Sequence, residues 1–334
     1  MTSINEVHDA QRLKELQSLP FERKIQITQA KIIEWYNYWK GKVYISFSGG
    51  ADSTVLLHIA RKIFPDIPVV FCNTGMEYPE LRKFVKQNNN ITWIKPEKSF
   101  IDIIKEFGWN YPNKDTALTI YYARKGSQWA IDKFNGVKKD GTKSKFRQRY
   151  KPWAYLIDSP FIISNICCIE MKEKPFRKYE RDAGNMPIIG TLAEESTRRK
   201  DSWLRTGCNA FDTDVPNSTP LSFWTHQDIL NYIIKYNVSY ASIYGDIINE
   251  KSKLKFTGEQ TTGCVFCPTG CHLDKENKYQ RLAKTHPQMY HRCIDGGEYN
   301  VDGKWIPNKQ GLGLGKLLDY VGVKYRPLKE DVKL

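Results

Sequence analysis

Long hydrophobic runs are missing from this sequence of 334 residues. No stretch of about 18 apolar residues, the usual minimum for a membrane-spanning helix, occurs in it. The first residues, Met-Thr-Ser-Ile-Asn-Glu, lack the charged and apolar regions of a signal peptide. Internal repeats and low-complexity tracts are absent as well. We therefore expect a cytoplasmic protein without a membrane span, with one large domain or one domain and a smaller appendage.

Cysteines are too few for a disulfide scaffold, since the chain has only eight. Clustered thiols in a reducing compartment usually bind metal instead. Cys167 and Cys168 are adjacent, Cys264 and Cys267 form a C-x-x-C pair, and Cys271 follows four residues later. Soft thiolates favour an iron–sulfur cluster or zinc over oxygen-preferring metals, and both alternatives stay open on this pattern.

Acidic residues are outnumbered, with 37 Asp and Glu against 51 Lys and Arg, a formal net charge of +14. This excess suits an anionic ligand, such as a sulfonucleotide or a nucleic-acid backbone, or simply a solubilising surface. Basic residues concentrate in 124–152, which is short of aliphatic residues and contains glycine. We interpret it as an exposed insertion or hairpin, either a solvated loop or an arm that contacts RNA or DNA.

Helical and strand patterns alternate through the first half of the chain. The alternation predicts a doubly wound α/β fold with a mainly parallel sheet, whose ligands bind at the carboxyl ends of the strands. We expect an N-terminal helical segment over 1–40, a nucleotide-binding domain over 41–245 and a cysteine-rich helical region over 246–334. The expected strands are 43–47, 67–72 and 91–94, and the expected helices lie within 8–40, at 52–63 and from about 79 to 88.

A Ser/Gly-rich turn follows the first expected strand and opens a helix. Such a turn brings several backbone N–H groups toward one oxyanion at a helix N-terminus. No lysine follows the glycines, which excludes the Walker A phosphate loop. The predicted phosphate contacts are Ser46, Ser48, Gly49, Gly50, Asp52 and Ser53.

The hexad from Ser48 to Ser53 resembles the S-G-G-x-D-S signature of the PP-loop superfamily, whose members bind ATP or an adenylyl-sulfate. The segments 71–80 and 190–199 are similar to those of phosphoadenosine phosphosulfate (PAPS) and adenosine phosphosulfate (APS) reductases, although Leu192 stands where that family often has arginine. The resemblance implies an adenine nucleotide as ligand, with magnesium as a further candidate. The implied contacts are Asn73, Thr74, Gly75, Lys172, Gly190, Glu195, Arg198 and Arg199.

The paired cysteines resemble the ligand set of APS reductases, which implies a 4Fe–4S cluster on Cys167, Cys168, Cys264 and Cys267, with Cys271 as substitute. Zinc remains the rival metal. The resemblance also implies a thiol nucleophile near the C-terminus, and Cys293 is the candidate although it lacks the family's surrounding sequence. Cys293 and Asp52 are the predicted catalytic residues, and a thioredoxin-type protein is the implied reductant.

Three functions are compatible with these patterns. The first is a sulfonucleotide reductase-like enzyme. The second is an ATP-dependent enzyme that transfers sulfur to tRNA or DNA, because the complete hexad suits ATP cleavage. The third is a noncatalytic nucleotide- and metal-binding module.

Overall fold

A computed structural model describes residues 8–327, and its chain divides into two compact units. The first unit combines the chain up to Asn73 with Glu77–Lys95 and Pro175–Gly263. The second combines Thr74–Met76, Pro96–Lys174 and the chain from Cys264 onward. This division differs from the expected boundaries at 40 and 245, because residues 96–174 pack with the C-terminal region rather than with the sheet.

The first unit contains a six-stranded sheet in the order β3-β2-β1-β4-β6-β5. All neighbouring pairs are parallel except β5 with β6. Ile45 in the central strand pairs with Val69 on one side and Ile188 on the other. The strands are β1 (Val43–Ser46), β2 (Val69–Cys72), β3 (Ile91–Ile94), β4 (Met186–Ile189), β5 (Asn209–Ala210) and β6 (Asn217–Ser218).

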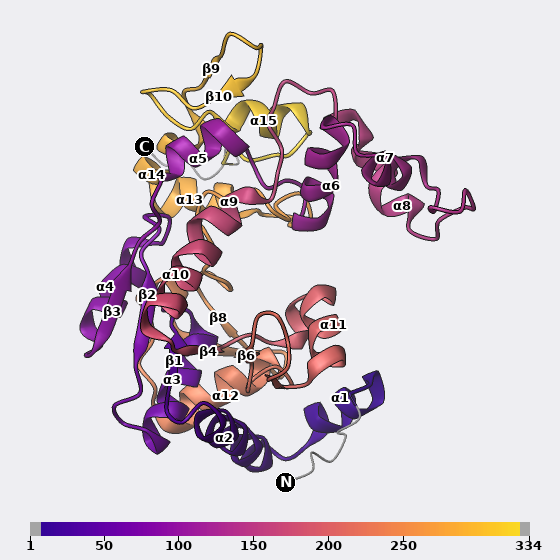
Figure 1. Ribbon diagram of the computed structural model, residues 1–334. Coiled ribbons are helices and arrows are strands. Elements are labelled where there is room, and N and C mark those ends of the chain that lie inside the picture. Colours follow the sequence, from indigo (N-terminus) through magenta and orange to yellow (C-terminus); the bar gives the residue numbers. More distant parts are fainter. Residues whose placement is uncertain (1–7, 328–334) are drawn as a thin grey trace. The chain divides into compact units, whose positions relative to one another are not determined.

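Helices cover both faces of this sheet. The Tyr44 ring contacts Phe176 and Tyr179 of α10 (Lys174–Ala183), so its neighbours Val43 and Ile45 point to the opposite face. The predicted doubly wound, mainly parallel α/β fold is therefore confirmed. The other helices of this unit are α1 (Ala10–Ser18), α2 (Phe21–Tyr38), α3 (Ala51–Ile63), α4 (Pro79–Gln87), α11 (Thr197–Thr206) and α12 (His226–Tyr236) (Figure 1).

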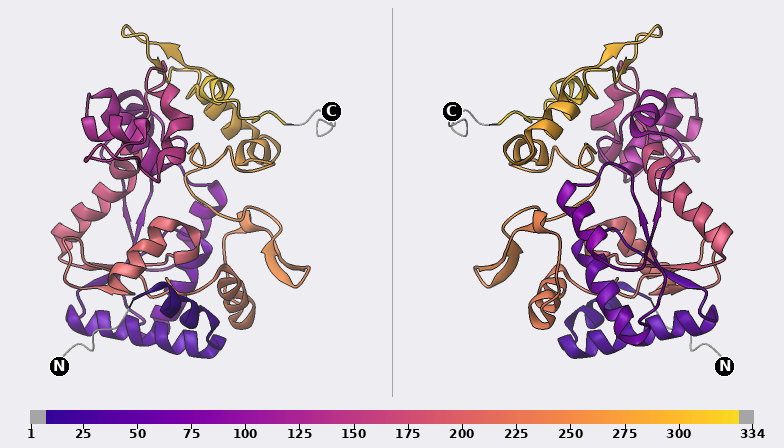
Figure 2. Two further views of the ribbon diagram at one scale, coloured as in Figure 1. Left: turned by 90° about the vertical axis from the view of Figure 1, so that its right-hand side faces the viewer. Right: turned by 90° about the vertical axis from the view of Figure 1, so that its left-hand side faces the viewer.

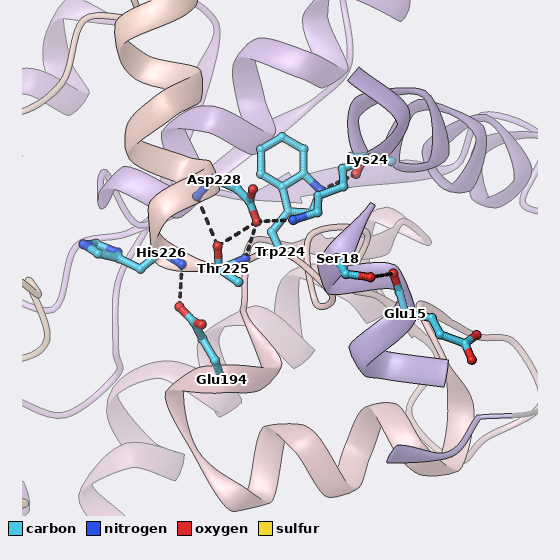
Figure 3. Close-up of polar contacts among 9 residues, drawn as sticks. Glu15, Ser18, Lys24, Glu194, Trp224, Thr225, His226 and Asp228 are labelled. Carbon is cyan, nitrogen blue, oxygen red and sulfur yellow. Dashed lines mark hydrogen bonds and ion pairs between the residues drawn. The ribbon is translucent and has the colours of Figure 1, made fainter. Parts of the chain in front are cut away.

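A buried ion pair joins α2 to the start of α12 (Figure 3). Lys24 Nζ donates to Asp228 Oδ2 at 2.8 Å, and both side chains are largely buried. The same carboxylate accepts from the Thr225 backbone and hydroxyl, which caps α12. Beside it, Trp224 Nε1 donates to Thr28 Oγ1 at 2.9 Å. Trp224 is fully buried and is thus a packing residue.

A short antiparallel hairpin, β7 (Ile247–Glu250) and β8 (Lys253–Phe256), extends beside α12 (Figure 2). The Gln227 amide exchanges two hydrogen bonds with the Leu254 backbone, both 2.8 Å long. A short 3₁₀ helix, η4 (Ser242–Tyr244), comes before this hairpin in the chain. Residues 246–263 therefore belong to the first unit rather than to the cysteine-rich region expected from residue 246 onward.

The second unit is mainly helical. Its C-terminal part is a small helical bundle with one two-stranded ribbon, β9 (Glu298–Tyr299) with β10 (Trp305–Ile306). Near its C-terminal end, α15 buries Leu314, Leu317 and Leu318. The helices are α5 (Phe100–Phe107), α6 (Lys114–Arg124), α7 (Gln128–Asn135), α8 (Arg147–Tyr150), η1 (Lys151–Leu156), α9 (Ile166–Cys168), α13 (Lys278–Thr285), α14 (Pro287–Ile294) and α15 (Leu314–Tyr320).

The basic segment 124–152 is only partly the exposed hairpin that the sequence suggests. Val137 and Lys143 form an antiparallel bridge, so a small hairpin is present. The residues before it form α7, which buries Ala130 and Phe134. Local composition missed this helix because its two buried positions give a weak periodic signal.

None of the helices in the described part of the chain combines the length and hydrophobicity that crossing a bilayer requires.

Candidate functional site

The turn between β1 and α3 is built around two glycines. Gly49 has φ +75°, a conformation that favours glycine, and a Cβ there would lie 2.8 Å from Leu81 and 2.7 Å from Val85 of α4. Gly50 is the N-cap residue of α3. The tight approach to α4 and the positive φ both require glycine at position 49. The turn leads directly into the N-terminus of α3.

Two serine hydroxyls of the predicted hexad face each other across this turn. Ser48 Oγ and Ser53 Oγ are 2.9 Å apart, and Ser53 Oγ also donates to the Gly50 carbonyl at 3.0 Å. Ser48 is exposed, whereas Ser53 is buried. The hydroxyls thus satisfy each other at a helix N-terminus, where an anionic ligand would be favoured by the helix dipole. Ser46 lies at the end of β1, partly buried.

Tyr244 and Thr262 complete the turn, and no sequence motif indicates either residue. The Ala51 N–H donates to the Tyr244 hydroxyl at 3.0 Å, and that hydroxyl is 2.8 Å from Thr262 Oγ1. Burial raises the pKa of Tyr244 to about 12, so the phenol stays neutral. One of the amides at the start of α3 is therefore held by a side chain from η4.

The turn after β4 lies directly against the start of α3. A Cβ on Gly190 would come within 2.9 Å of Ser53 Cα and 3.0 Å of Ser53 N, so only glycine allows this approach. Leu192, which stands where an arginine was expected, is buried, and its N–H donates to Glu195 Oε2 at 3.0 Å. Position 192 therefore supplies packing and no charge. Figure 3 shows Glu194 of the same turn accepting from the His226 backbone.

Charges gather around Asp52. Burial raises the pKa of its carboxyl to about 6, while the Arg199 charge lowers it and Glu194 raises it. Arg199 forms an ion pair with Glu195. The predicted residues Asp52, Glu195 and Arg199 are thus brought to one place, whereas Arg198 is exposed to solvent.

Asn73 follows β2, the strand next to β1 in the sheet. Its N–H donates to the Ile94 carbonyl at 2.9 Å, but its buried Oδ1 has no hydrogen-bond partner among the described residues. An unsatisfied buried amide oxygen is costly unless a ligand or water completes it. This feature supports a polar ligand at the carboxyl edge of the sheet.

The remaining predicted nucleotide contacts belong to the second unit. Gly75 has φ +75° and open space around it, and Thr74 Oγ1 accepts from the Met76 N–H at 3.2 Å. Lys172 lies in a π-helical turn over Ile169–Glu173, where its charge lowers the pKa of Cys168. Within the second unit, the charge of Lys172 therefore acts on a thiol.

All eight cysteines are free thiols, and the five predicted ligands influence one another's pKa within the second unit. Cys167 and Cys168 share a hydrogen bond that raises the pKa of Cys167 and lowers the pKa of Cys168. Burial raises the pKa of Cys167 further, and so do the nearby Cys267 and Cys264. The adjacent pair therefore favours one shared proton, with the negative charge on Cys168.

A hydrogen-bonded path links the two cysteine segments through Asn110, another residue that the sequence did not indicate. Asn110 Nδ2 donates to Cys168 Sγ at 3.5 Å, and the Asn110 carbonyl accepts from Thr269 Oγ1 at 2.8 Å. Thr269 Oγ1 in turn accepts from Cys267 Sγ at 3.2 Å. The path connects Cys168 with Cys267, which are far apart in the sequence.

The thiols fit a thiophilic metal by their chemistry but do not form a ready cage. Within residues 8–327, no group of three or more His, Cys, Asp or Glu side chains is arranged to hold a metal ion. Cys271 is buried, and burial raises its pKa to about 12. The cluster thus stays a prediction that rests on the proximity and softness of the donors.

Cys293, the predicted nucleophile, is fully buried in α14, and burial raises its pKa. Attack requires a thiolate with access to its substrate. Its surroundings are those of a packed structural thiol, and its catalytic role stays a prediction.

Comparison with known families gives a direct assignment. The profile of the phosphoadenosine phosphosulfate reductase domain matches residues 42–270, more than half of the chain. The chain belongs to this family. The match includes the turn after β1, the segment 190–199 and the predicted cysteine ligands up to Cys267, and it confirms the resemblance inferred from the motifs.

The similarity of this chain to two known proteins extends well beyond short motifs. An uncharacterized protein of Methanocaldococcus jannaschii is 25% identical over 268 residues, which is 79% of this chain and 50% of that protein. An adenosine 5'-phosphosulfate reductase of Staphylococcus haemolyticus is 24% identical over 220 residues, 64% of this chain and 70% of that enzyme. The chain thus spans only half the length of the first relative.

Among solved structures, a PAPS reductase from Candida auris in complex with phosphate aligns with a TM-score of 0.38 at 13% identity. The alignment covers 70% of this chain and 90% of the other. A score at this level supports no argument about the site.

Proposed function

We propose that this chain binds an adenine nucleotide, APS, PAPS or ATP, with its phosphates at the turn between β1 and α3. The observation that carries the proposal is the glycine-dependent turn at the carboxyl end of β1, with Ser48 and Ser53 facing each other at the N-terminus of α3. The unpartnered Asn73 oxygen nearby in the sheet edge and the Arg199 charge beside Asp52 support an anionic, polar ligand.

We further propose sulfonucleotide reduction as the reaction. A cysteine thiolate attacks the sulfate sulfur, the bond from sulfur to the phosphate oxygen breaks, and AMP (or its 3'-phosphorylated form from PAPS) leaves. A dithiol reductant of the thioredoxin type then releases sulfite and becomes a disulfide, which supplies the two electrons. Family membership and the APS reductase relative support this choice.

The thiols Cys167, Cys168, Cys264 and Cys267 are the proposed holders of an iron–sulfur cluster. When bound, such a cluster would polarise the sulfate group. Asn110 donates to Cys168, and Lys114 and Lys172 lower its pKa, so these residues favour a thiolate at that position.

ATP-dependent sulfur transfer to a nucleic acid is the second candidate. Two observations favour it: the complete Ser48–Ser53 hexad, which suits ATP cleavage, and the enclosed Cys293, which weakens the assignment of a reductase nucleophile.

An anaerobic turnover assay separates the two reactions. With APS or PAPS and a thioredoxin-type reductant, the first proposal predicts sulfite release that Cys293→Ser abolishes without loss of nucleotide binding. If protein with its full cluster content releases no sulfite, sulfonucleotide reduction is excluded. Cleavage of ATP to AMP and pyrophosphate only when a nucleic-acid acceptor is present would then support sulfur transfer.

A further inference from the structure

Three aromatic side chains are exposed in the part of the second unit that runs from α6 to α8. Tyr122 lies in α6, Trp129 lies in α7, and Phe146 is the N-cap residue of α8. The exposed fraction is 43% for Tyr122, 50% for Trp129 and 53% for Phe146. The rings of Tyr122 and Trp129 are neighbours, with centroids 6.3 Å apart and an interplanar angle of 82°. Single exposed aromatic residues are ordinary, but a group of them on one short segment indicates a contact surface.

Positive charge surrounds these rings. Between residues 124 and 152 the chain has ten Lys and Arg residues against two Asp residues, a net charge of +8. Asp115 lies 3.8 Å from Lys133 and 3.5 Å from Arg149, so it compensates only this part of the surface. Four further cations have no carboxylate within ion-pairing distance among the described residues: Lys139, Lys143, Lys145 and Arg147.

The cations and rings are in direct contact. Lys133 Nζ lies 4.1 Å from the centroid of the Trp129 ring and 4.9 Å from that of Tyr150. Lys145 Nζ lies 5.2 Å from the Phe146 centroid. Figure 1 shows α7 and α8 together, with the connecting hairpin extending beyond them.

The hairpin that presents several of these cations is ordered by its own backbone. The Lys138 N–H donates to the Thr142 carbonyl at 2.8 Å, and the Ser144 N–H donates to the Gly136 carbonyl at 2.8 Å. The Asp140 carboxylate, one of the two acidic groups, accepts from the Thr142 hydroxyl and backbone. The segment therefore presents an ordered, cationic surface and not a structureless tail.

We propose that this surface binds single-stranded nucleic acid. Exposed rings stack on bases whatever their sequence, and base faces are accessible only in unpaired strands, while lysine and arginine contact the phosphates. Charge complementarity thus selects a polyanion, and the exposed rings select one that carries planar bases. The inference goes beyond the proposed nucleotide reaction and does not depend on it.

Fluorescence anisotropy with labelled 20-nucleotide single-stranded DNA and RNA tests the proposal on the full chain. Replacing Lys143, Lys145, Arg147 and Arg149 by alanine should weaken binding more than tenfold near 0.1 M salt. It should also reduce the slope of log K against log salt by about 3, since each lost phosphate contact on a single strand contributes about 0.7. The matched control replaces four exposed lysines of the first unit, Lys14, Lys83, Lys86 and Lys253.

Trp129→Leu separates stacking from charge. It should weaken single-strand binding about fivefold or more and leave the salt slope unchanged, because a base–aromatic contact is lost. Tyr38→Leu, at an aromatic side chain of the first unit that is 53% exposed, is the control and should have no effect. Circular dichroism and a thermal melt of each variant verify that it is folded.

Three results would overturn the proposal: no binding by the wild-type protein, equal loss in the lysine control, or tighter binding of heparin or anionic vesicles that Trp129→Leu does not alter. Comparing the affinities for single-stranded DNA and RNA shows which of the two the surface prefers. Ser53→Ala should retain strand binding even if it abolishes nucleotide binding, so failure here and failure of the proposed function are distinguishable.

Discussion

The turn after β1 and the cysteine group of the second unit differ in how the chain connects their residues. The turn takes its main groups from eight consecutive positions, 46–53, and they hydrogen-bond with one another. The thiols come from segments separated by about a hundred residues and meet only through packing and the path over Asn110 and Thr269. A contiguous motif therefore defines its own geometry, whereas a dispersed ligand set depends on the fold and, in our proposal, on the metal itself.

Removing two thiols should give the largest effect. Cys264→Ser combined with Cys267→Ser should abolish iron binding, because two of the four proposed ligands are lost, while nucleotide affinity at the turn stays unchanged. Iron and sulfide assays on anaerobically purified protein, with isothermal titration of ATP, measure both. Cys208→Ser, at a buried thiol of the first unit, is the matched control. Full iron content in the double variant would contradict the ligand assignment, and a colourless wild type with one zinc per chain would favour the rival metal.

The stability of the first unit is expected to depend on the buried ion pair between Lys24 and Asp228. Lys24→Ala should lower the free energy of unfolding by about 3 kcal/mol, because it leaves the Asp228 carboxylate buried without its cation. Urea denaturation followed by circular dichroism measures the change. Lys14→Ala, an exposed substitution, should change stability by less than about 0.5 kcal/mol. A loss as small as the control's for Lys24→Ala would show that the pair contributes little.

Asp52 should make the free energy of unfolding depend on pH. Its folded pKa of about 6 lies above its usual 3.8, so the folded state holds the proton more tightly than the unfolded state. The free energy of unfolding of the wild type should therefore fall, relative to Asp52→Asn, as pH rises from about 4 through about 6. The difference should reach about 3 kcal/mol and stay constant above that range. Denaturation of both proteins at pH 4, 5, 6 and 7 checks this. A constant difference across the range would refute the raised pKa.

Much of the first unit could be predicted from the sequence because its signals are local. The apolar run ending at Cys72, the periodic helix after Gly50 and the short strand at Ile91–Ile94 each carry their pattern within a few residues. The unit boundaries could not be predicted, since the association of residues 96–174 with the C-terminal region arises from packing between distant segments. Helix α7 was missed for a similar reason, because a basic composition concealed its buried residues Ala130 and Phe134.

The same distinction holds for the site. The serines and glycines of the turn belong to a recognisable motif, and they lie together as expected. Tyr244, Thr262 and Asn110 reach their partners from 18 or more residues away and belong to no motif, so only the structure identifies them. Cys293 is the opposite case. Its place near the C-terminus suggested a reactive thiol, but the structure buries the side chain completely.

Isothermal titration of the full chain with ATP and with an adenylyl-sulfate tests the central claim most directly. With magnesium present the wild type should bind, and Ser53→Ala should weaken binding about tenfold, as expected when a hydrogen bond to a charged ligand is lost. Asp52→Ala should weaken it by a similar factor, because it removes the carboxylate proposed to hold the magnesium ion beside the phosphates. Ser18→Ala, at an exposed hydroxyl of α1 that donates to the Glu15 carbonyl (Figure 3), is the control and should bind like the wild type. Unchanged affinity in both turn variants, or a preference for GTP, would contradict the claim that this turn binds the adenine nucleotide.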